Sequence, residues 1–149
     1  MKAVGGLLIV LALVVGIVPL FTTCQSQGQA IALPNGKSIP MKCHWTGRAE
    51  LVAAVPLLAV GGMMTRSRRR ETIRALSAVG ILLGGLVILL PTSLIGVCAN
   101  PDMLCNMVMR PTLVLAGTLI IVTNAAGLWL ASRVESQQSV VEPGLGLPR

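Results

Sequence analysis

The sequence predicts an all-α membrane protein whose four transmembrane helices form two repeated helical hairpins. Hydrophobic residues make up 54% of its 149 residues and charged residues only 11%. A soluble domain of this size could not cover so much apolar surface with so few charges. Four apolar runs approach the roughly 20 residues that a helix needs to cross a bilayer. They cover residues 3–21, 45–64, 75–97 and 113–132.

A repeated motif supports the arrangement in two hairpins. Residues 41–48 (MKCHWTGR) and residues 103–110 (MLCNMVMR) both read M-x-C-x-x-x-x-R, and each copy stands before an apolar run. Since Met, Cys and Arg are scarce in this chain, their match at an offset of 62 positions indicates an internal repeat. The motif residues are Met41, Cys43, His44, Trp45 and Arg48 in the first copy, and Met103, Cys105 and Arg110 in the second.

The first apolar run follows Lys2 and is similar to a secretory signal. It is almost long enough to span a bilayer, so we expect an uncleaved helix. The polar loop that follows contains the tight-turn sequence Pro34-Asn35-Gly36-Lys37. Because residues 30–33 (AIAL) precede this turn, the loop is expected to form a small β-hairpin.

Polar and small residues within the later spans have structural interpretations. Arg48 and Glu50, at the outer end of the second span, are expected to snorkel or to pair at the interface. Gly80 and Gly84 form a small-residue face on which another helix could pack closely, and Asn124 is expected to hydrogen-bond a neighbouring helix.

The distribution of Lys and Arg predicts the orientation in the membrane. The loop between the second and third spans is strongly basic, and this accounts for the net charge of +7 without a nucleic-acid partner. The side with more Lys and Arg is cytoplasmic, so the chain is expected in the cytoplasmic (inner) membrane as a multi-pass protein with both termini inside. Residues 136–149 are expected to form a flexible cytoplasmic tail. The residues of the basic loop that determine the topology are Arg66, Arg68, Arg69 and Arg70.

The four cysteines then lie at the outer ends of the spans. Cys24 and Cys98 stand where outgoing helices end, and Cys43 and Cys105 stand where returning helices begin. Because thiols outside the cytoplasm are oxidised unless something protects them, we expect two disulfides, Cys24–Cys43 and Cys98–Cys105. Four cysteines allow three pairings, so a pairing between the hairpins stays open.

Two other functions stay open for the same residues. Four spans with a cysteine pair in each outer loop resemble the membrane disulfide-generating proteins that pass electrons to quinone, and Arg48 would activate the Cys43 thiol. The Cys-x-x-Cys motif of that family is absent here. Alternatively, thiol, thioether and imidazole groups would bind a soft, copper-like metal ion. The candidate ligands are Met41, Cys43, His44, Met103, Cys105 and Met107.

The segment MKCHWT at 41–46 resembles a functionally uncharacterised family of small four-span membrane proteins from bacteria and archaea. The second loop, CANPDMLC at 98–105, fits the same resemblance, which covers nearly the whole chain except the tail. The resemblance implies the four-span fold and no established activity.

The leading functional prediction is a non-enzymatic accessory subunit. The sequence contains no catalytic triad, carboxylate pair, phosphate-binding loop or haem motif, so we predict neither catalytic residues nor a cofactor. The expected partners are the lipid bilayer and another membrane protein, such as a transporter permease, contacted through the disulfide-stapled outer loops. The few charges within the spans argue against an ion-coupled transporter that acts alone.

Overall fold

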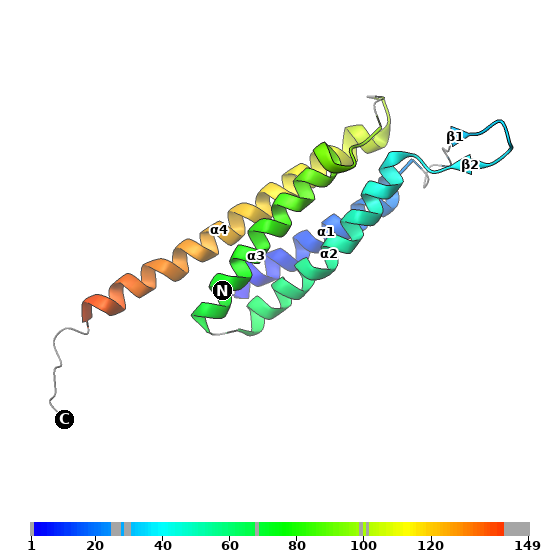
Figure 1. Ribbon diagram of the computed structural model, residues 1–149. Helices are drawn as coiled ribbons and strands as arrows, with labels where there is room; N and C mark the ends of the chain where they lie inside the picture. Colours follow the sequence, from blue (N-terminus) through cyan, green and yellow to red (C-terminus); the bar gives the residue numbers. More distant parts are fainter. Residues whose placement is uncertain are drawn as a thin grey trace.

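The structure, a computed structural model, describes residues 2–24, 28, 31–67, 69–98, 100 and 102–141, without the side chains of residues 2, 131 and 133–141. Its long helices run side by side and form an elongated bundle (Figure 1). The helical segments are α1 (Lys2–Thr22), α2 (Lys42–Arg66), α3 (Arg70–Leu89) with the π-helical turn η1 (Leu90–Leu94), and the π-helical turn η2 (Cys105–Met109), which leads into α4 (Arg110–Val141).

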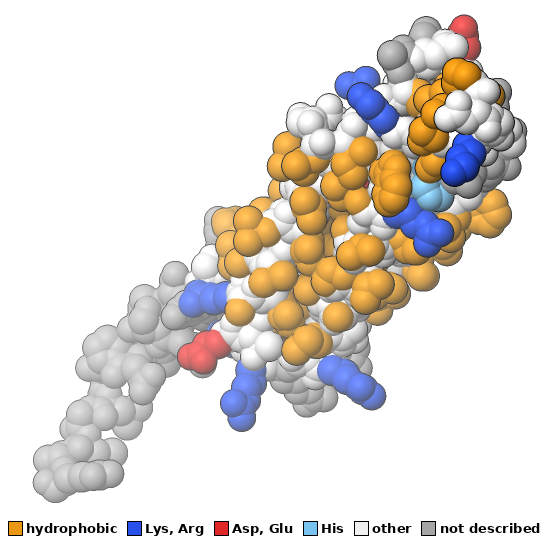
Figure 2. All heavy atoms as spheres, turned by 45° about the vertical axis from the view of Figure 1, so that its right-hand side comes forward, with side chains coloured by type: hydrophobic (Ala, Val, Ile, Leu, Met, Phe, Trp, Pro, Cys, Tyr) orange, Lys and Arg blue, Asp and Glu red, His pale blue; other side chains and the backbone are white. Residues whose placement is uncertain are grey.

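Within the described residues, four helical segments are long and apolar enough to cross a bilayer. On the face drawn in Figure 2, hydrophobic side chains cover the middle of the bundle, and Lys and Arg gather towards its two ends. Large side chains such as Val52 (71% exposed) and Leu82 (74% exposed) point away from the bundle, as is expected where lipid is the solvent. The predicted fold class is confirmed: the chain is an all-α, multi-pass membrane protein. The four segments are Ala3–Thr22, Lys42–Arg66, Arg70–Leu94 and Cys105–Leu130.

The helices extend beyond the apolar runs that predicted them. α2 begins at Lys42 instead of residue 45, and α3 begins at Arg70 instead of residue 75. Polar residues at the membrane interface continue a helix whose apolar centre lies in the lipid. The third span ends at Leu94, earlier than the predicted residue 97, because the chain turns at Gly96, which has φ of 77°.

The C-terminal tail predicted for residues 136–149 begins within α4, which continues to Val141. Residues 142–149 lie outside the described residues.

The small hairpin predicted in the first loop is present. β1 (Ile31–Ala32) pairs antiparallel with β2 (Ser38–Ile39). The Leu33 N–H donates to the Lys37 carbonyl at 2.9 Å, and Gly36 adopts φ of 73°, which suits glycine in a tight turn. The hairpin projects beyond the end of the bundle (Figure 1).

Glycines allow the two helices of each hairpin to pack closely. α1 lies along α2, and α3 lies along α4 (Figure 1). A Cβ added at Gly61 would stand 3.2 Å from the carbonyl oxygen of Gly5, and a Cβ added at Gly84 would stand 3.1 Å from that of Gly117. The backbones therefore approach more closely than larger residues would permit. The small-residue face predicted at Gly80 and Gly84 is thus covered by α4 of the same chain.

Asn124 is fully buried beside this face, but its hydrogen bond differs from the prediction. Its Nδ2 donates to the Ile120 carbonyl of its own helix at 2.8 Å, not to a neighbouring helix. Its Oδ1 has no hydrogen-bond partner among the described residues. The amide fits between α3 and α4 because Gly80 has no Cβ, which would collide with it.

The exchange Gly84→Ala should destabilise the bundle by about 1–3 kcal/mol, the usual cost of extra volume in a packed interior. The added Cβ would meet Ile121 Cγ1 at 2.9 Å and the Gly117 carbonyl oxygen at 3.1 Å. Gly85→Ala is the matched control, because nothing lies within 4 Å of a Cβ at that position. Unfolding of the purified protein in mixed micelles with rising SDS measures both variants. Equal stability of the two would contradict the close packing.

Candidate functional site

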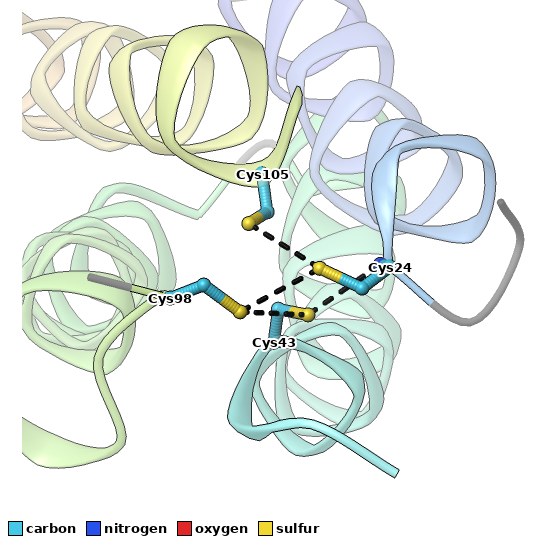
Figure 3. A group of neighbouring side chains, drawn as sticks. All are labelled: Cys24, Cys43, Cys98 and Cys105. Carbon is cyan, nitrogen blue, oxygen red and sulfur yellow. Dashed lines mark hydrogen bonds between the residues drawn. The ribbon is translucent and has the colours of Figure 1, made fainter. Parts of the chain in front are cut away.

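The four cysteines converge on one point at the end of the bundle opposite the connection between α2 and α3 (Figures 1 and 3). Cys24 follows α1, Cys43 lies in the first turn of α2, Cys98 follows η1, and Cys105 begins η2. Their side chains point towards one another (Figure 3), and the four Sγ atoms all lie within 4.8 Å of one another. We call these four residues the cysteine cluster.

Weak hydrogen bonds connect the sulfur atoms of the cluster. The Sγ of Cys24 lies 3.5 Å from that of Cys98 and 3.6 Å from that of Cys105. The Sγ of Cys98 lies 3.5 Å from that of Cys43, and the Cys24 N–H donates to the Cys43 Sγ at 3.4 Å. All four cysteines are free, because a disulfide requires about 2.05 Å between its sulfur atoms.

The cluster does not favour pairing within the hairpins over pairing between them. Cys24 lies beside Cys98 and Cys105 of the second hairpin as well as beside Cys43 of the first. The predicted disulfides Cys24–Cys43 and Cys98–Cys105 therefore stay predictions, and the positions of the sulfur atoms give pairings between the hairpins equal standing.

The thiols differ in burial and in acidity. Cys24, Cys43 and Cys105 are buried, and Cys98 is half-buried. Burial raises the pKa of Cys24, and hydrogen bonding with the three other thiols raises it further. Burial also acts to raise the pKa of Cys98, but hydrogen bonding with the other thiols outweighs burial and leaves this pKa below its ordinary value. The most exposed thiol of the cluster is thus one with a lowered pKa.

Thr46, on the α2 side of the cluster, helps to position it. Its side chain is fully buried one turn after Cys43, and its Oγ1 donates to the Gly96 carbonyl at 2.7 Å. This bond ties α2 to the segment that leads to Cys98. The first and second hairpins are therefore joined directly beside the sulfur atoms.

The spacing of the sulfur atoms suits one metal ion. Thiolates at about 2.3 Å from a tetrahedral metal ion stand about 3.8 Å apart. The contacting sulfur pairs, at 3.5 and 3.6 Å, are close to that spacing, and the remaining pairs stay within 4.8 Å. Sulfur ligands select soft ions such as Cu(I) or Zn(II). The cluster is therefore a candidate metal centre.

Two methionines predicted as ligands lie against the cluster. The Met41 Sδ is 3.9 Å from the Cys98 Sγ, and the Met103 Sδ is 3.8 Å from the Cys24 Sγ. Both methionines are half-buried and pack on the core.

The other predicted motif residues are not members of the cysteine cluster. The ring of His44 meets Trp45 edge-on, with 5.9 Å between ring centroids, and His44 is not among the clustered ligand atoms of the described residues. Met107 is 64% exposed. Arg48 and Arg110 are exposed. Burial and the neighbouring thiols are the main causes of the pKa shifts of Cys24 and Cys98.

The arginines predicted to determine the membrane topology lie at the end of the bundle opposite the cysteine cluster. Arg66 ends α2, Arg69 precedes α3 and Arg70 begins it. Arg68 lies outside the described residues.

Sequence reasoning did not identify two buried polar residues below the cluster, Thr46 and Glu50. Glu50 was expected to snorkel or to pair, and this was wrong: its side chain is fully buried, and neither carboxyl oxygen has a hydrogen-bond partner among the described residues. A usable signal was present, because positions 43, 46 and 50 fall on one face of a helix.

The exchange Thr46→Val should lower the affinity of the cluster for a soft metal ion by about 10-fold, a typical cost of losing a hydrogen bond that orients a ligand. Val keeps the shape of the side chain but removes the bond to Gly96. Thr46→Ser keeps the hydroxyl and is the control. Cd(II) titration, followed by thiolate charge-transfer absorption, measures the affinity. A Val variant that binds as tightly as the Ser variant would contradict the positioning role.

Comparison with known proteins identifies the family but no activity. Searches of curated proteins and of solved structures found no match. The family model described as "Domain of unknown function (DUF4418)" matches residues 3–130, which include the four spans and the cysteine cluster. This match agrees with the expected membership of a functionally uncharacterised family. The chain belongs to the DUF4418 family.

Proposed function

We propose that the protein is an integral membrane protein that binds a soft metal ion through the cysteine cluster. The observation that carries the proposal is the convergence of Cys24, Cys43, Cys98 and Cys105, from four separate segments, to within 4.8 Å. Four thiol groups can supply the complete ligand set of a tetrahedral site.

The burial of the cluster supports this function. Three of the four cysteines are buried and the fourth is half-buried, so water has little access to the sulfur atoms. An ion held by all four thiolates would carry neither a water ligand nor an open coordination position, which is typical of closed sites and not of catalytic ones. We therefore favour binding over hydrolytic metal catalysis.

The orientation proposed from the basic loop adds a second argument. Arg66, Arg69 and Arg70 lie at the end of the bundle opposite the cluster. With this loop in the cytoplasm, the cluster faces the oxidising side of the membrane. Free thiols persist there only when something protects them, and a bound soft ion would do so.

Thiol–disulfide exchange is the second candidate function. It is favoured by Cys98, which is half-buried, has a lowered pKa and lies 3.5 Å from both Cys24 and Cys43. The Cys98 thiolate could attack an external disulfide, releasing one of its sulfurs as a thiol and forming a mixed disulfide. Attack by Cys24 or Cys43 on the Cys98 sulfur would then release the second external thiol and leave a disulfide within the cluster. The two structural disulfides predicted from sequence would consume the same four thiols.

An accessory role beside a transporter permease stays a hypothesis with less support. The disulfides of its expected contact surface stay predictions, and the small-residue face on which another helix could pack is taken up within the chain, where Gly84 packs against Gly117. The large exposed side chains of the spans are accounted for by lipid. Metal binding at the cluster and membership of a larger complex are compatible.

The internal repeat also remains a proposal. The second and fourth spans begin at Lys42 and Cys105, within one residue of the proposed offset. Each hairpin pairs its own two helices, and each places two cysteines in the cluster. A site shared between the halves is typical of membrane proteins built from repeats.

Titration of the reduced protein in mild detergent with Cd(II) tests the proposed function. We expect thiolate charge-transfer absorption to saturate at one ion per chain, because four converging thiols form one site. Cys43→Ser should weaken binding by more than about 100-fold, beyond the usual effect of changes around the ligands.

The control uses the fact that the chain has only 4 cysteines. A variant with all four exchanged for Ser should give no absorption, and residual saturable binding would contradict the proposal. Alkylation of membranes isolated with a thiol trap separates the two candidate functions. Thiols released only by a metal chelator support metal binding, and thiols released only by a reductant support disulfide chemistry.

Neutralising the basic loop tests the orientation. Exchange of Arg66, Arg68, Arg69 and Arg70 for Gln should produce mixed orientations, because these charges hold the loop in the cytoplasm. The matched control exchanges the four basic residues near the other end, Lys37, Lys42, Arg48 and Arg110, and should keep one orientation. Reporter fusions after Arg149 measure both. A wild-type fusion that is active only outside the cytoplasm would refute the orientation.

A further inference from the structure

We propose that Met41 and Met103, which lie against Cys98 and Cys24, are thioether ligands at the cysteine cluster and make it selective for a monovalent soft cation such as Cu(I) over Zn(II). This inference rests on the proposed metal-binding function and specifies the class of ion.

The distances place each methionine as a partner of one cysteine. The Met41 Sδ lies 3.9 Å from the Cys98 Sγ, and the Met103 Sδ lies 3.8 Å from the Cys24 Sγ. These separations match the roughly 3.8 Å between two sulfur ligands of one tetrahedral ion. An ion could therefore be held by either thioether together with the thiol beside it.

The contacts are reciprocal between the two hairpins. Met41 precedes Cys43 by two residues but contacts Cys98 of the second hairpin. Met103 precedes Cys105 by two residues but contacts Cys24 of the first hairpin. The Met of each M-x-C motif thus lies against the cysteine that ends the outgoing helix of the other hairpin. This arrangement gives the methionine of the motif a specific role that apolar packing at a helix start would not require.

The exposure of the two methionines fits ligands on an entry route. Both are half-buried, as is Cys98, whereas Cys24, Cys43 and Cys105 are buried. An incoming ion would meet a partly exposed thioether before the buried thiols. The two thioethers contact different cysteines, so an ion could reach the cluster past either methionine.

Ligand chemistry determines which ion these positions favour. Thioether sulfur is soft and uncharged, and soft thioether and thiolate ligands together select Cu(I). Zn(II) is bound by thiolate, imidazole and carboxylate ligands. Thioethers also add donor atoms without adding negative charge, which suits an ion with a single positive charge in a buried site.

The test compares two metals on the full chain, purified, reduced and kept without oxygen in mild detergent. Cu(I) is competed against a chromogenic Cu(I) chelator, and Zn(II) against a zinc indicator. The exchange of both Met41 and Met103 for Leu should lower the Cu(I) affinity by at least about 10-fold and leave the Zn(II) affinity unchanged. Met107→Leu is the matched control, because Met107 lies in η2 but is 64% exposed, and it should change neither affinity.

The outcomes separate the inference from the proposed function. If the wild-type chain binds neither ion, the proposed function fails. If the wild-type chain binds both ions, the affinities of the double variant test the thioether inference alone. That inference is overturned if the double variant keeps both affinities or loses Cu(I) and Zn(II) affinity equally.

A second measurement does not depend on how the variant folds. Selenomethionine-labelled wild-type protein, loaded with Cu(I), should show a selenium–copper distance in its selenium X-ray absorption spectrum. A loaded protein with no selenium–copper contact would overturn the inference.

Discussion

Close contact between helix backbones is the constraint on which the rest of this structure depends. Lipid is as apolar as the spans, so the hydrophobic effect does not drive helices together within a membrane, and packing must do so. The helices of each hairpin touch through paired glycines, Gly5 with Gly61 and Gly84 with Gly117. At each pair the carbonyl oxygen of one helix lies where a Cβ on the other helix would crowd it. A larger separation of the axes would carry the helix ends apart, and the cysteines stand at those ends.

The cysteine cluster is also where the two hairpins are joined. The sulfur contact between Cys24 and Cys98, the contact between Cys43 and Cys98, and the bond from Thr46 to Gly96 all run from one hairpin to the other. Polar groups in apolar surroundings are costly when they lack partners, so thiols that contact one another favour this docked arrangement. Glu50, four residues after Thr46 in α2, is buried and has no hydrogen-bond partner among the described residues. Its burial costs free energy and so opposes the docking of the hairpins. Buried ionisable groups that are kept at such a cost within a span are typical of functional regions.

The sequence predicted the spans well because hydrophobicity and length are local properties. It also predicted the hairpin of the first loop, whose Pro-Asn-Gly turn has a direct conformational meaning. It could not place Cys24 beside Cys98 and Cys105, because that contact depends on how two hairpins dock and not on any spacing within one of them. The same limit applied to Glu50. Its position near a helix end indicated the membrane–water interface, but it shares a helical face with Cys43 and Thr46, and that face points into the bundle. The bond of Asn124 to its own helix was missed for a related reason, since the space for its amide is created by Gly80, a residue of another helix.

The placement of four sulfur atoms from four segments at one end has a mechanical consequence. An ion held by all of them would join chain positions 19, 55 and 74 residues apart, and closing such loops restricts the unfolded chain far more than it restricts the folded one. That end of the bundle would be fastened, while the described residues of α1 and α4 show no comparable link at the other end. Thermal separation of α1 from α4 would therefore begin at the end away from the cluster and stop at the cluster. The amplitude of that motion would rise along α1 and α4 with distance from the sulfur atoms.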